Sequence, residues 1–285
     1  MILTDSHAHL SLVVERLGRD ILASLLIDYA QAWESAMRLG HPLPLILEPG
    51  VDPDDLAARV GLLDRGSGLP PFMRLAAGIW PSAANLASPE TSLLALEEAM
   101  AEAARRGIDI AAIGEGGLDY HHMEGEAEVQ ARLFEGQIAF ASDLGLPMIV
   151  HSRDAAADTL AILARTRGSS SIILHCFGYG PAEARAFLDL DCWISFAGNI
   201  SYKGSDALRE ACALVPADRL LLETDSPYMN PTPRRGKGAT PLDIERTYAL
   251  AADLRGVSLL ELADTISVNA HMLVGGGKKA ASRGE

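Results

Sequence analysis

Four histidines and two acidic residues stand at or near the ends of short apolar runs in this 285-residue sequence. They are His7, His9, Glu115, His151, His175 and Asp225. Residues two apart on an extended strand point to the same face, so His7 and His9 can converge on one ion. Nitrogen and carboxylate ligands without a thiolate suit Zn²⁺, Mn²⁺ or similar divalent ions. These residue types therefore predict a metal site, provided that the fold brings them together.

No single histidine carries this prediction, because a lone histidine at a strand end is usually a hydrogen-bonded residue of the rim. The joint placement of all six at the ends of apolar runs is what favours a metal centre. His41 and His271 lack such a placement, and we interpret them as structural or surface residues. His121 and His122 follow the fourth run. We interpret them as solvated loop residues, and a lining of the site's mouth is the alternative.

The elements that must position these ligands are apolar runs that alternate with stretches of helical periodicity. The runs cover residues 2–6, 45–51, 74–79, 110–115, 147–151, 172–175, 193–196 and 220–225. Strands that are apolar on both faces, each followed by a helix, favour an α/β fold of the (β/α)8 TIM barrel type over a doubly wound open sheet. The carboxyl ends of the strands share one rim in such a barrel, and active sites lie there. The fold would therefore gather the six ligands.

Composition places the chain among ordinary globular proteins, with 48% hydrophobic and 22% charged residues. No composition break interrupts it, so we expect a single domain over residues 1–274 and a disordered tail over residues 275–285. Three cysteines are too few for a disulfide framework. No apolar stretch of about 18 residues predicts a membrane span, and no signal-peptide pattern opens the sequence. We therefore expect a cytoplasmic protein.

The net charge of −14 disfavours binding of nucleic acid through a broad basic surface. It leaves open an enzyme whose positive charge is concentrated in a metal site. The basic residues Arg234, Arg235 and Lys237 form one compact cluster, in the loop after the last apolar run. A solvated loop is the ordinary interpretation of such a cluster. Its place at the predicted rim favours Arg235 as a contact to a substrate backbone.

The motifs around the predicted ligands extend well beyond the ligands themselves. They read DSHAHL at 5–10, IGEGGLDY at 113–120, VHSR at 150–153, LHCF at 174–177, ISFAG at 194–198, LETDSPY at 222–228, RGK at 235–237 and NA at 269–270. Together they resemble the TatD family of metal-dependent hydrolases, within the amidohydrolase-like barrels. The resemblance runs nearly from end to end. It implies a (β/α)8 barrel, two divalent metal ions (Zn, Mn or Mg), and deoxyribonuclease or related phosphodiester hydrolysis.

The resemblance also implies a role for each ligand. His7, His9 and Asp225 would hold one metal, His151 and His175 the second, and Glu115 would bridge both. Asp225 is the candidate for accepting a proton from the attacking water, and Glu115 is the second candidate catalytic residue. Glu223 lies two residues before Asp225. It either orients the ligands or makes a buried structural hydrogen bond.

Substrate contacts are predicted at Arg153 and Trp80. Arg153 follows His151 closely, and its planar guanidinium could grip a phosphate, although a surface salt bridge would explain it equally well. Trp80 stands where the family usually has a histidine near the metals. Its ring can stack on a base or sugar, or simply pack against the mouth. Gly116 replaces a usual bulky aliphatic residue, Ala239 replaces a usual asparagine, and the first connection, residues 11–44, is longer than expected.

The leading hypothesis is a metal-dependent deoxyribonuclease of the exonuclease type, with DNA as its substrate. The acidic surface and Trp80 favour an alternative, the hydrolysis of a small phosphoester, amide or ester. A third interpretation is a noncatalytic metal-binding barrel. A broken ligand set would mark that interpretation, and the sequence has an intact one.

Overall fold

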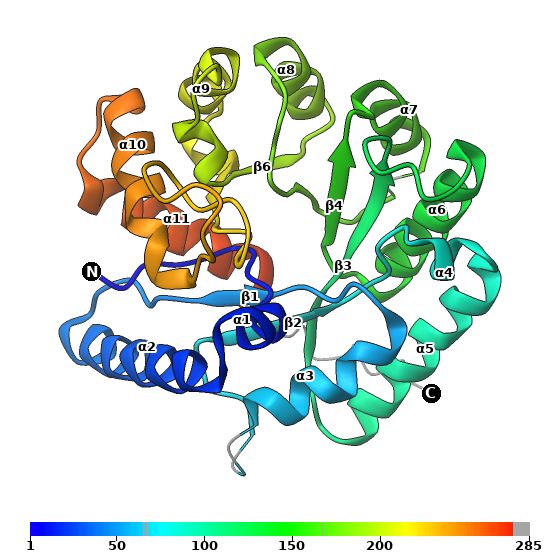
Figure 1. Cartoon of the computed structure of the whole chain (residues 1–285), viewed down its shortest axis with the longest axis horizontal. Helices are drawn as coiled ribbons and strands as arrows, with labels where there is room; N and C mark the ends of the chain where they lie inside the picture. Colours follow the sequence, from blue (N-terminus) through cyan, green and yellow to red (C-terminus); the bar gives the residue numbers. More distant parts are fainter. Residues whose placement is uncertain (65, 67, 167, 276–285) are drawn as a thin grey trace, which may run out of the picture.

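The computed structural model describes residues 1–275 apart from residues 65, 67 and 167. In this part of the chain, seven strands lie side by side in sequence order, and every neighbouring pair is parallel. Their bounds are β1 Ile46–Glu48, β2 Met73–Ala77, β3 Ile110–Asp119, β4 Met148–Arg153, β5 Ile172–Leu174, β6 Trp193–Phe196 and β7 Leu220–Leu222. The sheet curls, and helices surround it (Figure 1). The predicted α/β class with a parallel sheet is confirmed.

At least one helix follows every strand, so that each crossover returns the chain to the same end of the sheet. The α-helices are α1 Leu10–Leu17, α2 Arg19–Leu39, α3 Leu56–Leu63, α4 Ala83–Leu86, α5 Pro89–Arg105, α6 Ala127–Leu144, α7 Ala156–Thr166, α8 Pro181–Asp189, α9 Asp206–Leu214, α10 Glu245–Arg255 and α11 Leu259–Val274. Short 3-10 turns are η1 Pro53–Asp55, η2 Gly198–Ser201, η3 Ala217–Arg219 and η4 Pro241–Ile244. The long first connection holds both α1 and α2, which accounts for its length.

The predicted strand at residues 2–6 is not a regular strand. This segment makes isolated parallel bridges, Asp5 to Ile46 of β1 and Ala8 to Ser226 beyond β7. Its backbone nevertheless contacts both edges of the sheet, since the Asp5 N–H donates to the Leu45 carbonyl and the Ser6 N–H donates to the Leu222 carbonyl. The expected eight-stranded barrel is therefore found only in part. Seven strands form a curled sheet, and an irregular segment lies between its first and last strands.

The fourth apolar run, residues 110–115, forms a longer strand than the sequence predicts. Strand β3 continues to Asp119 rather than ending at Glu115. Its register against β4 shifts between Ile113 and Gly116, and the Glu115 N–H donates to the carbonyl of Gly50 instead. Such irregularities bend a strand and redirect a side chain. Glu115 thus reaches the site from a break in the ladder within β3.

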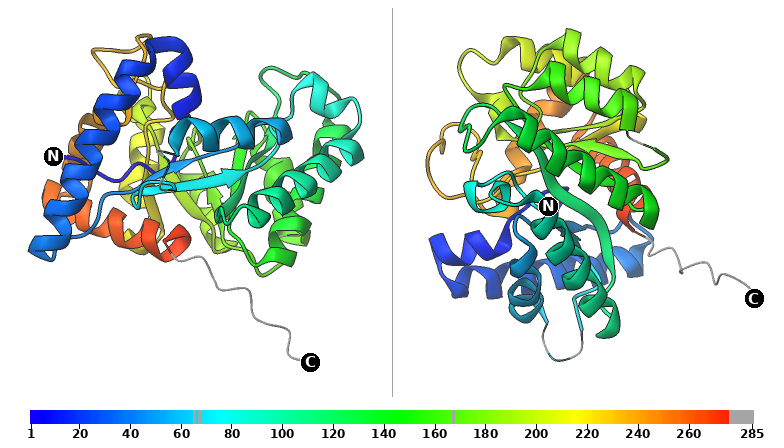
Figure 2. Two further views of the ribbon diagram at one scale, coloured as in Figure 1. Left: turned by 90° about the horizontal axis from the view of Figure 1, so that it is seen from below. Right: turned by 90° about the vertical axis from the view of Figure 1, so that its right-hand side faces the viewer.

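The inside of the curled sheet is filled toward the amino ends of the strands. Leu45, Leu47, Ile149, Ile173 and Leu221 form one apolar cluster there, and Ala270 and Val274 of α11 pack against it. Helix α11, red in Figure 2, thereby lies against this end of the sheet. Two further apolar clusters lie between the sheet and the outer helices.

Two predictions concern the chain ends and membranes. The tail expected over residues 275–285 lies, beyond residue 275, outside the described residues. Within the described ranges, no single helix is long and apolar enough to cross a membrane. One pair of segments, residues 241–255 and 259–274, passes by length and composition but is bent by 108°.

Candidate metal centre

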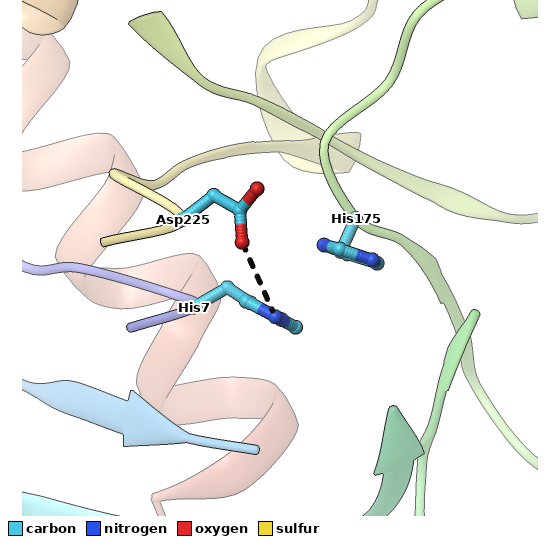
Figure 3. A group of neighbouring side chains, drawn as sticks. All are labelled: His7, His175 and Asp225. Carbon is cyan, nitrogen blue, oxygen red and sulfur yellow. Dashed lines mark ion pairs between the residues drawn. The ribbon is translucent and has the colours of Figure 1, made fainter. Parts of the chain in front are cut away.

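The six predicted ligands meet at the carboxyl ends of the strands, although they span most of the sequence. Their ring nitrogens and carboxylate oxygens form three overlapping groups, in each of which the ligand atoms lie within 4.8 Å of one another. Figure 3 shows His7, His175 and Asp225 directed toward a common space. The rings of His7 and His175 stack with their centroids 4.0 Å apart. The fold therefore assembles the predicted site.

Glu115 lies at the centre of this arrangement, with a different histidine pair on each oxygen. Its Oε2 is 3.2 Å from His7 Nε2 and 3.3 Å from His9 Nε2. Its Oε1 is 2.8 Å from His151 Nδ1 and 3.0 Å from His175 Nε2. A carboxylate placed this way can contribute one oxygen to each of two ions.

Asp225 completes the first of these two groups. Its Oδ1 lies 3.5 Å from His9 Nε2 and 3.9 Å from His7 Nε2. The residue has a φ of 53° and follows closely after β7. Few residues other than glycine adopt this left-handed backbone, and aspartate tolerates it better than most. The unusual conformation turns the Asp225 carboxylate toward the two histidines.

The spacing of the side-chain atoms fits divalent ions. His7 Nε2 and His9 Nε2 are 3.2 Å apart, and His151 Nδ1 and His175 Nε2 are also 3.2 Å apart. Two ligands of one tetrahedral Zn²⁺, each about 2.0–2.1 Å from it, lie about 3.3 Å from each other. Neutral imidazoles and carboxylates are also the usual nitrogen and oxygen ligands of such ions. The types of these ligand atoms and the distances between them therefore both fit a divalent ion.

Opposite charges in the site hold its carboxylates ionised. Burial alone would raise the pKa of Glu115, but the surrounding imidazoles outweigh it and lower the pKa well below its usual range. Burial is likewise outweighed at Asp225, where a hydrogen bond with His9 lowers the pKa. Against the effect of burial, Asp225 and Glu115 raise the pKa of His9 to about 9. Glu115 and Glu223 likewise raise the pKa of His175 well above its usual value. Both acids are therefore ready to bind cations.

The segment that carries His7 and His9 is tied to the last strand. The His7 carbonyl accepts the Asp225 N–H, and the His9 N–H donates to the Ser226 carbonyl. The buried Asp5 carboxyl accepts hydrogen bonds from the N–H and hydroxyl of Thr224, at 2.9 and 2.6 Å. Burial raises the pKa of Asp5 to about 8. Local folding thus fixes His7 beside Asp225.

Two acidic residues contact the ring nitrogens of His151 and His175 that do not face Glu115. Asp119 Oδ2 accepts from His151 Nε2 at 2.9 Å, which leaves Nδ1 of that ring to face Glu115. Glu223 Oε1 accepts the Cys176 N–H and lies 3.4 Å from His175 Nδ1. A carboxylate behind a ligating histidine orients the ring and strengthens it as a ligand. The orienting contact considered for Glu223 is present, whereas Asp119 has no role in the sequence-based predictions.

A period-two pattern could have identified Asp119. It lies four residues after Glu115 on β3, so on a regular strand both side chains would share one face. The register shift at Glu115 weakens that pattern, because the alternation is interrupted there. The contact with His151 therefore becomes evident only in three dimensions.

Trp80 lies at the site, among histidines of the mouth. Its ring is edge-on to His151 and to His122, with centroids 6.0 Å apart in both pairs. His122 lies half-exposed in the turn after β3, as its interpretation as a loop residue predicts. Asp119 nevertheless binds both its backbone N–H and its ring. Its edge-on contact with Trp80 also fits the alternative interpretation, a lining of the mouth.

The two predicted arginines differ in their surroundings. Arg153 is exposed at the end of β4, two residues after His151 and therefore on the same face of the strand. Its guanidinium forms no salt bridge within the described residues. Arg235 lies over the ring of Tyr202, with 4.3 Å between the guanidinium carbon and the ring centroid. Arg234 instead pairs with Asp243, so it is less available to a substrate.

The side chain of Gln137 explains why residue 116 is glycine. A Cβ on Gly116 would lie 2.4 Å from Gln137 Nε2, so no larger residue fits beside this amide. Gln137 Oε1 accepts the N–H of Ile79 at 2.8 Å, and its Nε2 donates to the Ile79 carbonyl at 2.9 Å. The missing side chain at 116 therefore allows α6 to hold the residue that precedes Trp80. Ala239 is fully buried, and nothing in the structure explains why asparagine is absent there.

Comparisons with known proteins identify the family of this chain. The family model described as TatD related DNase matches residues 4–275. A relative from Escherichia coli K12, an uncharacterized metal-dependent hydrolase named YcfH, is 41% identical over 161 residues, which span 56% of this chain and 61% of YcfH. An uncharacterized metal-dependent hydrolase named TatD, from Mycobacterium tuberculosis, is 33% identical over 62% of this chain and 72% of its own length.

Solved structures show the same fold. The crystal structure of YjjV, a TatD homologue from E. coli K12, has a TM-score of 0.77 at 25% identity, covering 97% of this chain and 100% of that one. A TatD family hydrolase from Entamoeba histolytica has a TM-score of 0.76 at 17% identity, covering 96% and 98%. Because the family match extends over almost the whole sequence, and the predicted ligands gather at one rim, the chain belongs to the TatD family.

Proposed function

We propose that this protein is a metal-dependent phosphodiesterase that hydrolyses DNA from a strand end. The observation that carries the proposal is the position of Glu115, with a separate histidine pair on each of its two oxygens. This arrangement suits two neighbouring cations, which are a common device for cleaving phosphodiesters. The match to a family of related DNases favours DNA as the substrate.

Each ligand has a place in this proposal. His7, His9 and Asp225 would hold one ion, His151 and His175 would hold the second, and Glu115 would contribute an oxygen to each. Zn, Mn and Mg are all compatible with this donor set, and availability in the cell would select among them. When bound, such ions supply Lewis acidity that readies water for attack, together with positive charge for a phosphate.

The protein's own residues carry the remaining steps. The Asp225 carboxylate, ionised because of the imidazoles around it, accepts the proton of the attacking water. Arg153 extends from the same strand face as His151 and binds a phosphate oxygen with its planar fork. Arg235, held against Tyr202, binds a phosphate farther along the strand. Trp80 offers an apolar surface for a base or sugar beside the metal ligands.

Cleavage of an end-labelled single-stranded DNA by the metal-loaded protein tests this function. Wild-type protein should shorten the labelled DNA stepwise. Glu115→Ala should lose about 1,000-fold or more of that rate, because each histidine pair loses the carboxylate oxygen beside it. Metal content of both proteins is measured in parallel. Equal DNA cleavage by the wild type and the variant would mean that the activity arises elsewhere.

A second candidate function is the hydrolysis of a small phosphoester, amide or ester. The packing of Trp80 against His151 favours it, because an indole at this position narrows the space beside the ligands. The net charge of −14 also opposes the approach of a long polyanion. Faster turnover of such small compounds than of DNA would select this function, and protein purified without any bound metal would favour a noncatalytic barrel. A cytoplasmic location is part of the proposal in either case.

A further inference from the structure

His122 is a histidine of the mouth that the proposed chemistry does not use. It follows β3, and its side chain is 49% exposed. Its Nδ1 lies 2.9 Å from Asp119 Oδ2, and its backbone N–H donates to Asp119 Oδ1 at 2.7 Å. Asp119 therefore fixes both the main chain and the ring of His122.

The hydrogen bonding leaves one ring nitrogen of His122 available. An ionised carboxylate can only accept hydrogen bonds, so Nδ1 must carry the proton that Asp119 receives. The Asp119 carboxylate lies 2.9 Å from the rings of both His122 and His151. Among the residues that the structure describes, His122 Nε2 has no hydrogen-bond partner. The buried Asp119 carboxylate orients the ring, and Nε2 remains free to bind a ligand.

The position of His122 relative to the metal ligands indicates which ligand it meets. Asp119 Oδ2 lies 2.9 Å from both His122 Nδ1 and His151 Nε2, so one oxygen separates the free imidazole from a predicted metal ligand. The Trp80 ring lies edge-on to both imidazoles, with its centroid 6.0 Å from each. A group bound beside His151 would therefore lie next to His122.

His121 provides a contrast at the neighbouring position. Its side chain is 51% exposed, almost as much as that of His122. Its ring lies 3.5 Å from Asp154, whose side chain is itself 69% exposed. Exposed ion pairs of this kind fix a side chain only weakly. Two adjacent histidines of similar exposure thus differ in whether a buried carboxylate orients them.

We propose that His122 is a substrate-binding residue that donates a hydrogen bond from Nε2 to a nonbridging oxygen of the substrate's phosphate. The inference rests on the proposed phosphodiesterase function and identifies the group that receives the phosphate on the β3 side of the mouth. A ring protonated on both nitrogens bonds to Asp119 and to the phosphate at once. Such hydrogen bonds between charged groups are stronger than neutral ones.

Asp119 acts as a positioning residue for this contact and for the metal site together. Since one of its oxygens receives both His122 and His151, Asp119→Asn should weaken metal binding and phosphate binding at the same time. A change of His122 alone should weaken only phosphate binding. The pair of variants therefore separates the phosphate contact from the support of the ligand His151.

Titration of the Mn²⁺-loaded protein with inorganic phosphate tests the inference without requiring catalysis. His122→Asn places an amide near Nδ1 and removes Nε2, so phosphate Kd should rise about 10-fold or more, the effect of losing one charged hydrogen bond. His122→Gln, whose amide nitrogen can reach the position of Nε2, should restore part of the affinity. His121→Asn is the matched control and should leave the Kd within about two-fold of the wild type.

Kinetics on single-stranded DNA and titrations with Mn²⁺ complete the test. His122→Asn should raise KM for DNA about 10-fold and leave the Mn²⁺ affinity unchanged within about two-fold. Wild-type phosphate affinity in His122→Asn, an equal loss in His121→Asn, or no phosphate binding by the wild type would each overturn the inference. If the wild type binds phosphate through His122 but cleaves no DNA, the proposed nuclease function fails and the phosphate site stands.

Discussion

Glu48 is a buried carboxyl group outside the predicted ligand set. It ends β1 with no exposed surface, and its Oε1 accepts the N–H of Ser11 in the first turn of α1. Its Oε2 has no hydrogen-bond partner within the described ranges. Burial raises the pKa of Glu48 from its ordinary value of 4.5 to about 7, despite an opposing effect of Arg59.

This raised pKa predicts a specific effect of pH on stability. The folded state retains the Glu48 proton between pH 4.5 and about 7, whereas the unfolded state releases it, so stability falls as the pH rises through this window. Glu48→Gln removes that dependence, and its amide oxygen still accepts from Ser11. The variant should gain up to about 3 kcal/mol relative to the wild type between pH 4.5 and pH 8.

Urea unfolding of both metal-free proteins at several pH values checks this prediction. The difference in unfolding free energy should grow steadily between pH 4.5 and pH 8. Asp55→Asn serves as a control for general charge effects, because Asp55 is a nearby acid that is partly exposed and paired with Arg59. A difference that does not change with pH would show that Glu48 titrates alike in both states.

At the residue scale, the sequence predicts ligands better than the groups that support them. His7, His9 and Asp225 stand out because ligand types gather at the ends of apolar runs, and this pattern is visible in one dimension. Asp119 supports His151, which is far away along the chain, and the period-two pattern that could mark Asp119 is interrupted at Glu115. The contact between His122 and Asp119 depends on the geometry of the loop after β3. The roles of the six ligands and of Arg153, Trp80 and Arg235 stay predictions.

Among the secondary-structure elements, α6 and β3 are coupled by the contact between Gln137 and Gly116. The Gln137 amide occupies the space where a side chain at 116 would lie, and it makes two hydrogen bonds with Ile79. Gly116→Ala should destabilise the protein by about 1–3 kcal/mol, because the amide must move and leave buried backbone groups unpaired. Denaturant unfolding measures this loss.

A double-mutant cycle tests the physical origin of that effect. Gln137→Ala alone should also destabilise the protein, but adding Gly116→Ala to it should cost much less than in the wild type, since the clash is gone. Gly61→Ala is a suitable control, because a Cβ at this helical glycine would meet no atom within 4 Å. Additive losses in the cycle would exclude the contact with Gln137 as the cause.

For the strands, the local sequence predicts that a strand exists better than it predicts where the strand ends. Runs of buried apolar residues predict that strands exist, and seven of the eight predicted runs form one. Their ends are less predictable, because hydrogen bonding to neighbours decides where a ladder stops. Strand β7 ends at Leu222, before Glu223 and Asp225, since the backbone beyond it turns to meet His7.

At the scale of the whole molecule, the irregular segment at residues 2–6 lies between β1 and β7, and two buried tyrosines donate hydrogen bonds to it. Tyr29 of α2 donates to the Leu3 carbonyl at 2.7 Å, and Tyr248 of α10 donates to the Thr4 carbonyl at 2.8 Å. Both side chains are fully buried. Helices from opposite parts of the sequence therefore position the segment that leads into His7.

Removing these hydroxyl groups should weaken both the fold and the first ligand group. The double variant Tyr29→Phe and Tyr248→Phe leaves two buried carbonyls without these donors, at a cost of about 1–3 kcal/mol each. Its Mn²⁺ affinity should also fall, because His7 and His9 lose part of their support. Unfolding curves and metal titrations measure the two effects.

Tyr202→Phe provides the comparison for this prediction. It removes a similar hydrogen bond, from the Tyr202 hydroxyl to the Asn230 carbonyl, in a loop that does not hold the segment. Its metal affinity should match that of the wild type. If both changes reduce metal binding equally, the tyrosines of α2 and α10 have no special part in placing the histidines.

For the molecule as a whole, the repeated alternation of strand and helix made the parallel α/β fold predictable. The irregular pairing of residues 2–6, the first predicted strand, was not predictable, because these residues have the apolar character of a strand. What prevents regular pairing is their environment: Asp5 bonds to Thr224, and the chain turns immediately into α1. The extent of the single domain, residues 1–274, stays a prediction.

The connection between His7 and Asp225 has a consequence for the protein while it is being made. The ribosome releases His7 long before Asp225, to which it bonds, and before Tyr248, which holds the segment that leads into His7. A nascent chain therefore cannot assemble the complete centre, nor can a proteolytic fragment that ends before β7. The six predicted ligands can therefore meet only after the chain beyond β7 has been translated.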